Sequence, residues 1–218
     1  MDSREIIDNI GSIYERFRIP EHLQMHMLRV AAVGKLICRN WKGGKINEDD
    51  VVAVLLLHDL GNVVRFDFDN EGLNAIYSEK SNLDEMREIM EGTIEKYGED
   101  DHEVTDKMCR ELGVNDRISF LLNNKAFVQN KEVCASGDFE LKICAYADQR
   151  IGPLGVMGLR ERLDEAKVRG SKSLQHPEVD LLIECALEIE GQVLGNADLS
   201  AGDINDDSVR GYVENINS

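Results

Sequence analysis

The chain has 218 residues, 42% of them hydrophobic, which is enough to bury a sizeable core as one domain. Its 42 acidic and 25 basic residues give a net charge of −17, which disfavours polymeric DNA or RNA as a partner. The charged start MDSREIIDN lacks the apolar core of a signal peptide, and nowhere do eighteen apolar residues follow one another. We therefore expect a cytoplasmic protein that does not span a membrane.

Helical periodicity prevails along the sequence. Only three prolines interrupt it, and no alternating pattern of Val, Ile and Thr suggests a sheet. We predict an all-α, single-domain helical bundle over residues 1–195, followed by a tail over 196–218 that docks on it. The tail is rich in Asn, Asp, Ser and Gly, with a short helical pattern near 209–216. The five cysteines are odd in number and lack CxxC spacing, so we expect reduced thiols.

A first helix is expected over residues 21–39, in the sequence HLQMHMLRVAAVGKLIC. His26 shares a face with Val30 and Val33, which follow one and two turns later. A histidine on an apolar face is more often a core residue than a ligand, so His26 alone identifies no site.

A second helix is expected over residues 48–60. Asn47 followed by Asp50 resembles a capping box, and Gly61 suits a left-handed helix end. Nothing polar interrupts residues 51–57, and a helix that is apolar on all sides is an interior helix.

His58 and Asp59 stand side by side at the end of this apolar run. A buried carboxylate costs several kcal/mol unless it is paired, so Asp59 needs a cation or a strong donor. Adjacent helical residues point about 100° apart, so the two side chains share one ion only near a helix end. Alternatively, this helix end simply reaches the surface.

An acidic stretch lies between residues 79 and 106. Its apolar residues keep helical spacing, which indicates an amphipathic helix whose charges form a solvated face. These apolar residues are Leu83, Met86, Ile89, Met90 and Ile94.

A further apolar run, in DFELKICAYADQRIGP, ends in Asp148, and Gly152 and Pro153 are predicted to stop that helix. As a plain core acid, Asp148 would pair with Arg150 or Tyr146.

Taken together, four residues favour a metal site over separate core residues: His26, His58, Asp59 and Asp148. Two neutral imidazoles and two carboxylates carry a charge of about −2 and suit a divalent cation. Without a thiolate, the set disfavours structural zinc and favours Mn, Fe, Co, Ni, Mg or catalytic Zn. Water-bearing metal sites of this kind perform hydrolysis.

The order of these residues resembles the HD-domain metal-dependent phosphohydrolase superfamily over roughly residues 20–170. His26 begins HMLRVA, Leu-Gly follows the His58-Asp59 pair, and ADQRIGPLGVMGLRERL after Asp148 looks like the family's return into a further helix. The resemblance implies an all-α fold, metal ligands at all four positions and a role for Asp59 in orienting the attacking water. We expect an enzyme that hydrolyses a small phosphate ester, such as a nucleotide.

Many members of the superfamily add two histidines that recruit a second metal. His102 in DHEVTDKMCRELGV, a helix that Gly113 would end, is a candidate for the first. Asn123, Asn124 and Lys125 stand where the second is expected, and an amide is a poor ligand for a transition metal. His102 is thus either a second-site ligand or a solvated histidine. If Lys125 points into the site, its charge would stand in for the missing cation.

Arg29 and Arg150 are the candidates for holding the substrate, because a guanidinium matches phosphate oxygens in a bidentate way. Each could instead pair with a structural acid. Arg65 is a weaker third candidate, and His22, one turn before His26, could line the same opening or lie at the surface.

Two other functions remain open at this point. One is a binding module that senses a nucleotide without turnover, and the other is a di-iron enzyme that activates oxygen. Asn123 and Asn124 speak against the second, because they remove a ligand that a second iron would need. A homo-oligomer is compatible with the sequence.

Overall fold

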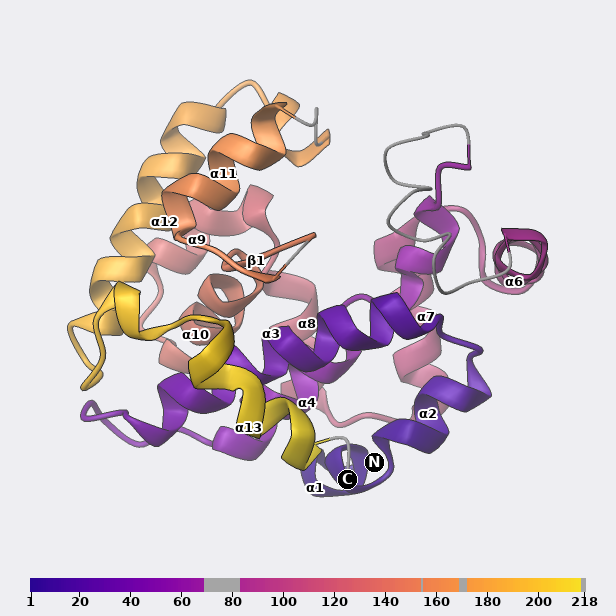
Figure 1. The fold of residues 1–218 in the computed structure, drawn as a ribbon, viewed down its shortest axis with the longest axis horizontal. Coiled ribbons are helices and arrows are strands. Elements are labelled where there is room, and N and C mark those ends of the chain that lie inside the picture. The colour runs from indigo at the N-terminus through magenta and orange to yellow at the C-terminus, as the bar shows by residue number, and fades with distance from the viewer. Residues whose placement is uncertain (69–82, 154, 169–171, 217–218) are drawn as a thin grey trace.

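The computed structural model describes all residues except 69–82, 154, 169–171 and 217–218 (Figure 1). The described part is helical apart from one antiparallel pair of short strands, β1 (Ile151–Gly152) and β2 (Gly155–Val156). The predicted all-α class is confirmed. None of the described helices is both long and apolar enough to cross a membrane.

The α-helices, in chain order, are α1 (Ser3–Asp8), α2 (Ile10–Arg16), α3 (Glu21–Arg39), α4 (Glu48–Leu57), α6 (Leu83–Tyr97), α7 (Asp101–Leu112), α8 (Asp116–Asn124), α9 (Asn130–Ala135), α10 (Phe139–Asp148), α11 (Leu159–Val168), α12 (Val179–Leu194) and α13 (Asp206–Ile216). Short 3-10 helices join them: η1 (Leu60–Arg65), η2 (Phe127–Gln129), η3 (Lys172–Gln175) and η4 (Ala201–Asp203).

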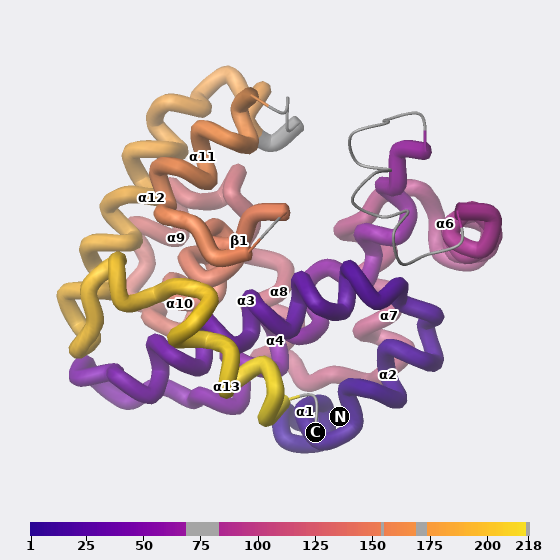
Figure 2. The backbone as a smooth tube through the Cα atoms, in the orientation of Figure 1, coloured from indigo at the N-terminus to yellow at the C-terminus, as the bar shows by residue number. Residues whose placement is uncertain are grey.

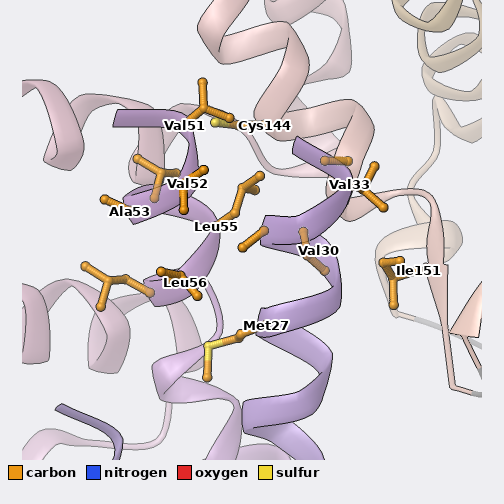
Figure 3. Close-up of a cluster of buried hydrophobic side chains, with 14 of the residues drawn as sticks. Met27, Val30, Val33, Val51, Val52, Ala53, Leu55, Leu56, Cys144 and Ile151 are labelled. Carbon is orange, nitrogen blue, oxygen red and sulfur yellow. The ribbon is translucent and has the colours of Figure 1, made fainter. Parts of the chain in front are cut away.

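The centre of the fold is formed by α3, α4 and α10, which pack against one another. Every residue from Val51 to Leu57 is buried, as the apolar run predicts. Gly34 allows α3 to approach α4 closely, since a Cβ there would lie 2.4 Å from Leu55 Cδ1. Figure 3 shows the resulting cluster, with Met27, Val30, Val33, Leu55, Leu56, Cys144 and Ile151.

The other helices cover this centre. In Figure 2 the chain of α12 runs beside α9 and α11, and α13 then returns along α3. Val209 and Ile216 of α13 are buried, so the last described residues belong to the same core. All five cysteines are free thiols.

The acidic helix α6 is amphipathic, with Met86 and Ile89 buried and its acids exposed. Leu83 differs from the expectation because it is exposed at the first position of the helix. Residues 79–82 of the acidic stretch lie outside the described part of the chain.

Two predicted helix ends are wrong. The helix predicted over 48–60 ends at Leu57, and a 3-10 turn follows. The helix that ends in Asp148 stops there, four residues before Gly152, which lies in β1. The first helix ends directly before His58 and the second at Asp148, and neither ends at the glycine.

The predicted capping box at the start of α4 is also only half correct. The Asn47 side chain accepts a hydrogen bond from the backbone N–H of Asp49. Asp50 accepts instead from the hydroxyl of Ser3 in α1. It therefore ties α1 to the start of α4.

Gly61 is required for close packing and not for a left-handed conformation, which it does not adopt. A Cβ at this position would lie 2.1 Å from the backbone oxygen of Asp101 and 2.8 Å from the backbone nitrogen of Thr105. The Gly61 N–H donates to the Thr105 hydroxyl at 2.9 Å. Gly61 thus sets the contact between η1 and α7.

Gly61→Ala is therefore expected to destabilise the fold by about 1–3 kcal/mol, because η1 must move away from α7. Gly92, exposed within α6, is the matched control, since nothing lies within 4 Å of a Cβ there. Gly92→Ala should stabilise by about 0.5–1 kcal/mol through helix propensity. Thermal unfolding of the two variants gives both values; an unchanged Tm for Gly61→Ala would contradict the packing argument.

Candidate metal centre

Three helix positions bring the predicted ligands together. His26 lies in the second turn of α3, His58 and Asp59 directly follow α4, and Asp148 is the last residue of α10. Because α3, α4 and α10 pack in the centre, these side chains meet at one place. Ligand atoms of His26, His58 and Asp148 all lie within 4.8 Å of one another.

Asp59 lies between the two histidines. Its Oδ2 is 3.3 Å from His26 Nε2 and 3.4 Å from His58 Nε2. Asp148 Oδ1 is 3.3 Å from His58 Nε2. Ligands at about 2.1 Å from a shared ion lie about 3.0–3.4 Å apart, so each of these three spacings is compatible with a shared ion. The set whose ligand atoms are all mutually close is His26, His58 and Asp148, and Asp59 adjoins it through the two histidines.

The orientation of His58 favours a cation as well. Its side chain is fully buried, and its Nδ1 lies 2.7 Å from the backbone oxygen of Leu55, which places the proton on Nδ1. Nε2 has no hydrogen-bond partner among the described residues, although it faces the carboxylates of Asp59 and Asp148. A lone pair on Nε2 that faces two carboxylates is unfavourable unless a cation or a proton lies between them.

The charges of the cluster support the same conclusion. Burial alone would lower the pKa of His58, but Asp59 and Asp148 raise it above the usual value. Burial would raise the pKa of Asp59, but His58 and His26 lower it to about 2. Burial would raise the pKa of Asp148 as well, but Lys125 and His58 hold it well below the usual value. Both carboxylates are therefore ionised at neutral pH and attract positive charge.

Lys125 supplies part of that charge. It caps the C-terminus of α8, and its side chain is only 8% exposed. Its Nζ donates a hydrogen bond to Asp148 Oδ2 at 2.7 Å. Burial by itself lowers the pKa of Lys125, yet Asp148 and Asp59 raise it, so the ammonium is charged. The lysine thus points into the cluster.

The two residues before Lys125 do not point into the cluster. Asn123 donates to Asp106 at 3.4 Å, and Asn124 donates to the backbone oxygen of Phe120 at 2.7 Å.

His102 is not brought into the cluster. Within the described part of the chain, no group of three metal ligands includes it. It lies at the start of α7 and lines a cavity of about 210 Å³ together with His58, Asp106, Ser119, Asn123 and Gln129.

Arg150 corrects the sequence-based prediction, because it does not reach the open side of the cluster. It is 1% exposed. Its guanidinium donates to the Tyr146 hydroxyl and to the backbone oxygens of Met157, Ala201 and Ile204. These bonds fix the segment before α13 to the core and leave the side chain no freedom to hold a substrate. Asp148 pairs with Lys125 and not with Arg150.

The other candidates for substrate contacts differ in their surroundings. Arg65 pairs with Asp101 at the start of α7, with an Nη1–Oδ2 distance of 3.1 Å. His22 lies against the ring of Phe66, with ring centroids 5.3 Å apart, and burial lowers its pKa to about 4. Arg29 is partly buried on α3 and makes no hydrogen bond or ion pair with any residue that the structure describes.

Sequence reasoning missed Tyr14. Its hydroxyl donates to the backbone oxygen of Leu56, next to the pair of ligands, at 2.8 Å. Burial, together with the negative charge of Asp59, raises its pKa well above the usual value. Its helical spacing with Ile10 and Ile13 predicts a buried residue, but no local signal indicates that it supports the end of α4.

The comparisons with known proteins add one finding. The family model of the HD domain matches residues 23–148, which begin just before His26 and end at Asp148. Neither the comparison with curated proteins nor that with solved structures found a match.

Proposed function

The chain belongs to the HD-domain family, and from this membership we propose that it is a metal-dependent hydrolase of a small phosphate ester. The observation that carries the proposal is the convergence of His26, His58 and Asp148, with Asp59 Oδ2 within 3.4 Å of both histidines and the unpartnered Nε2 of His58 facing two carboxylates. Mn, Co, Ni, Fe, Zn and Mg all suit such a mixed nitrogen and oxygen donor set.

A divalent ion bound there would supply hydroxide near neutral pH and neutralise charge on the phosphoryl oxygens. The residues of the chain prepare that chemistry. The Leu55 carbonyl holds the His58 ring in the tautomer that offers Nε2. Asp59 uses Oδ2 against both histidines, and its Oδ1, which has no partner among the described residues, would orient the attacking water by accepting a hydrogen bond from it.

A nucleotide or another small phosphate ester is the proposed substrate. The net charge of −17 opposes a polymeric nucleic acid, whereas a small phosphate can be held by local positive charge. Arg29 is the proposed second contact, because it follows His26 by three residues on α3 and its guanidinium is not engaged by any described residue. The cavity beside His58 would take the remainder of the substrate through the hydrogen-bonding groups that line it.

The proposal is tested by phosphate release. Purified protein is incubated with each candidate metal and with p-nitrophenyl phosphate, bis-p-nitrophenyl phosphate and nucleoside mono- and diphosphates. Metal-dependent hydrolysis of at least one ester, lost on chelation and restored by metal, is expected. Tight nucleotide binding without release under any of these conditions would favour a sensing module instead.

A further inference from the structure

Lys125 is in direct contact with the candidate metal centre, although it is not a metal ligand. It ends α8, and its ammonium contacts Asp148 Oδ2, while Asp148 Oδ1 faces His58. One carboxylate therefore joins a fixed positive charge to the ligands. Buried lysines are rare unless they are paired, and here the pairing partner is itself a ligand.

The hydrogen bonds of Lys125 are incomplete. An ammonium has three N–H donors, and Asp148 accepts one of them. Among the residues that the structure describes, no other acceptor contacts Nζ. Two donors thus remain beyond the bond to Asp148, whose other carboxylate oxygen lies 3.3 Å from His58 Nε2.

The charges of the groups around Lys125 do not cancel one another. Asp59 and Asp148 contribute two negative charges, and Lys125, whose Nζ lies 2.7 Å from Asp148 Oδ2 as an ion pair, contributes one positive charge. A divalent ion among the four ligands would bring the sum to +1. A centre with net positive charge and free N–H donors suits an oxyanion.

We propose that the Lys125 ammonium binds the phosphoryl group of the substrate, as a fixed cation beside a single metal ion. This inference rests on the proposed function and extends it to a residue that is not a ligand. Asp148 then has two tasks, since one oxygen faces the metal position and the other holds the lysine in place.

The competing explanation is that Lys125 only neutralises Asp148. Both explanations predict that removing the lysine affects the metal, so metal binding cannot separate them. Phosphate affinity compared at equal metal content can, because a lysine that contacts the phosphoryl group donates a hydrogen bond to it, and a lysine that only neutralises Asp148 does not.

The experiment measures the affinity of metal-loaded protein for inorganic phosphate by calorimetry, with the metal content of each sample determined in parallel. Lys125→Met should weaken phosphate binding by at least about tenfold, since a charge-assisted hydrogen bond is lost. Lys125→Arg, which keeps the charge, should retain most of the affinity. Lys131→Met removes an exposed lysine of α9 and should bind phosphate like the wild type.

Equal phosphate affinity in the wild type and in Lys125→Met would overturn the inference, as would the absence of phosphate binding to the metal-loaded wild type. Lys125→Gln keeps an N–H donor without the charge and gives the same readout if the methionine variant does not fold. Failure of the proposed function can be distinguished from failure of this inference. A metal-loaded wild type that releases phosphate from none of the esters would refute that function, whereas phosphate binding that depends on Lys125 in the same sample would still support the inference.

Discussion

Asp59→Asn is expected to abolish phosphate release and to weaken metal binding while leaving the helical content unchanged. The amide is isosteric with the carboxylate, but it removes the charge that faces both His26 and His58 and is a poor ligand. Loss of an outer partner of a ligand costs about 10–100-fold, so loss of the ligand itself should cost more.

The matched control for Asp59→Asn is Asp164→Asn, an exposed aspartate of α11. It makes the same chemical change away from the centre and should leave both activity and metal content intact. Far-ultraviolet circular dichroism and elemental analysis accompany the kinetics. Full metal content with unreduced turnover in Asp59→Asn would show that Asp59 is only a buried acid.

Arg150→Met should produce the largest loss of stability without direct damage to the centre. The guanidinium is 1% exposed, and its removal leaves three backbone oxygens and the Tyr146 hydroxyl without their donor. We expect a loss of about 3 kcal/mol, which lowers Tm by about 6–12 °C in a chain of this size.

Arg210→Met is the control for Arg150→Met, because Arg210 forms an exposed ion pair with Asp207 and its side chain is 68% exposed. Such surface pairs contribute about 0–1 kcal/mol, so its Tm should barely change. At a temperature where Arg150→Met remains folded, its metal content should equal that of the wild type. A normal Tm combined with a raised KM would restore Arg150 as a substrate-binding residue.

Local sequence signals predicted much of the fold and the residues that cluster. The helix over 21–39 was predicted with its observed bounds, because its apolar residues keep a regular helical period. His58, Asp59 and Asp148 stand at the ends of apolar runs, where a polar residue has either to reach the surface or to find a partner. Packing of α3, α4 and α10 then brings them to His26.

Features that depend on distant parts of the chain were beyond local reasoning. Arg150 was expected to face the centre because it is two residues from Asp148, but acceptors of its hydrogen bonds lie 51 and 54 residues later. Gly61 was expected to end a helix, whereas its contact is with Thr105, 44 residues away. The environment of Lys125 likewise depends on how α8 ends against α10.

We propose that His26, His58, Asp59 and Asp148 hold one divalent metal ion. The most direct test of this proposal is the metal content of untagged protein purified without chelator and then supplied with Mn, Co, Ni, Fe or Zn, measured by elemental mass spectrometry. We predict about one ion per chain in the wild type and a large loss in Asp59→Asn. A wild type that takes up none of these ions would contradict the account.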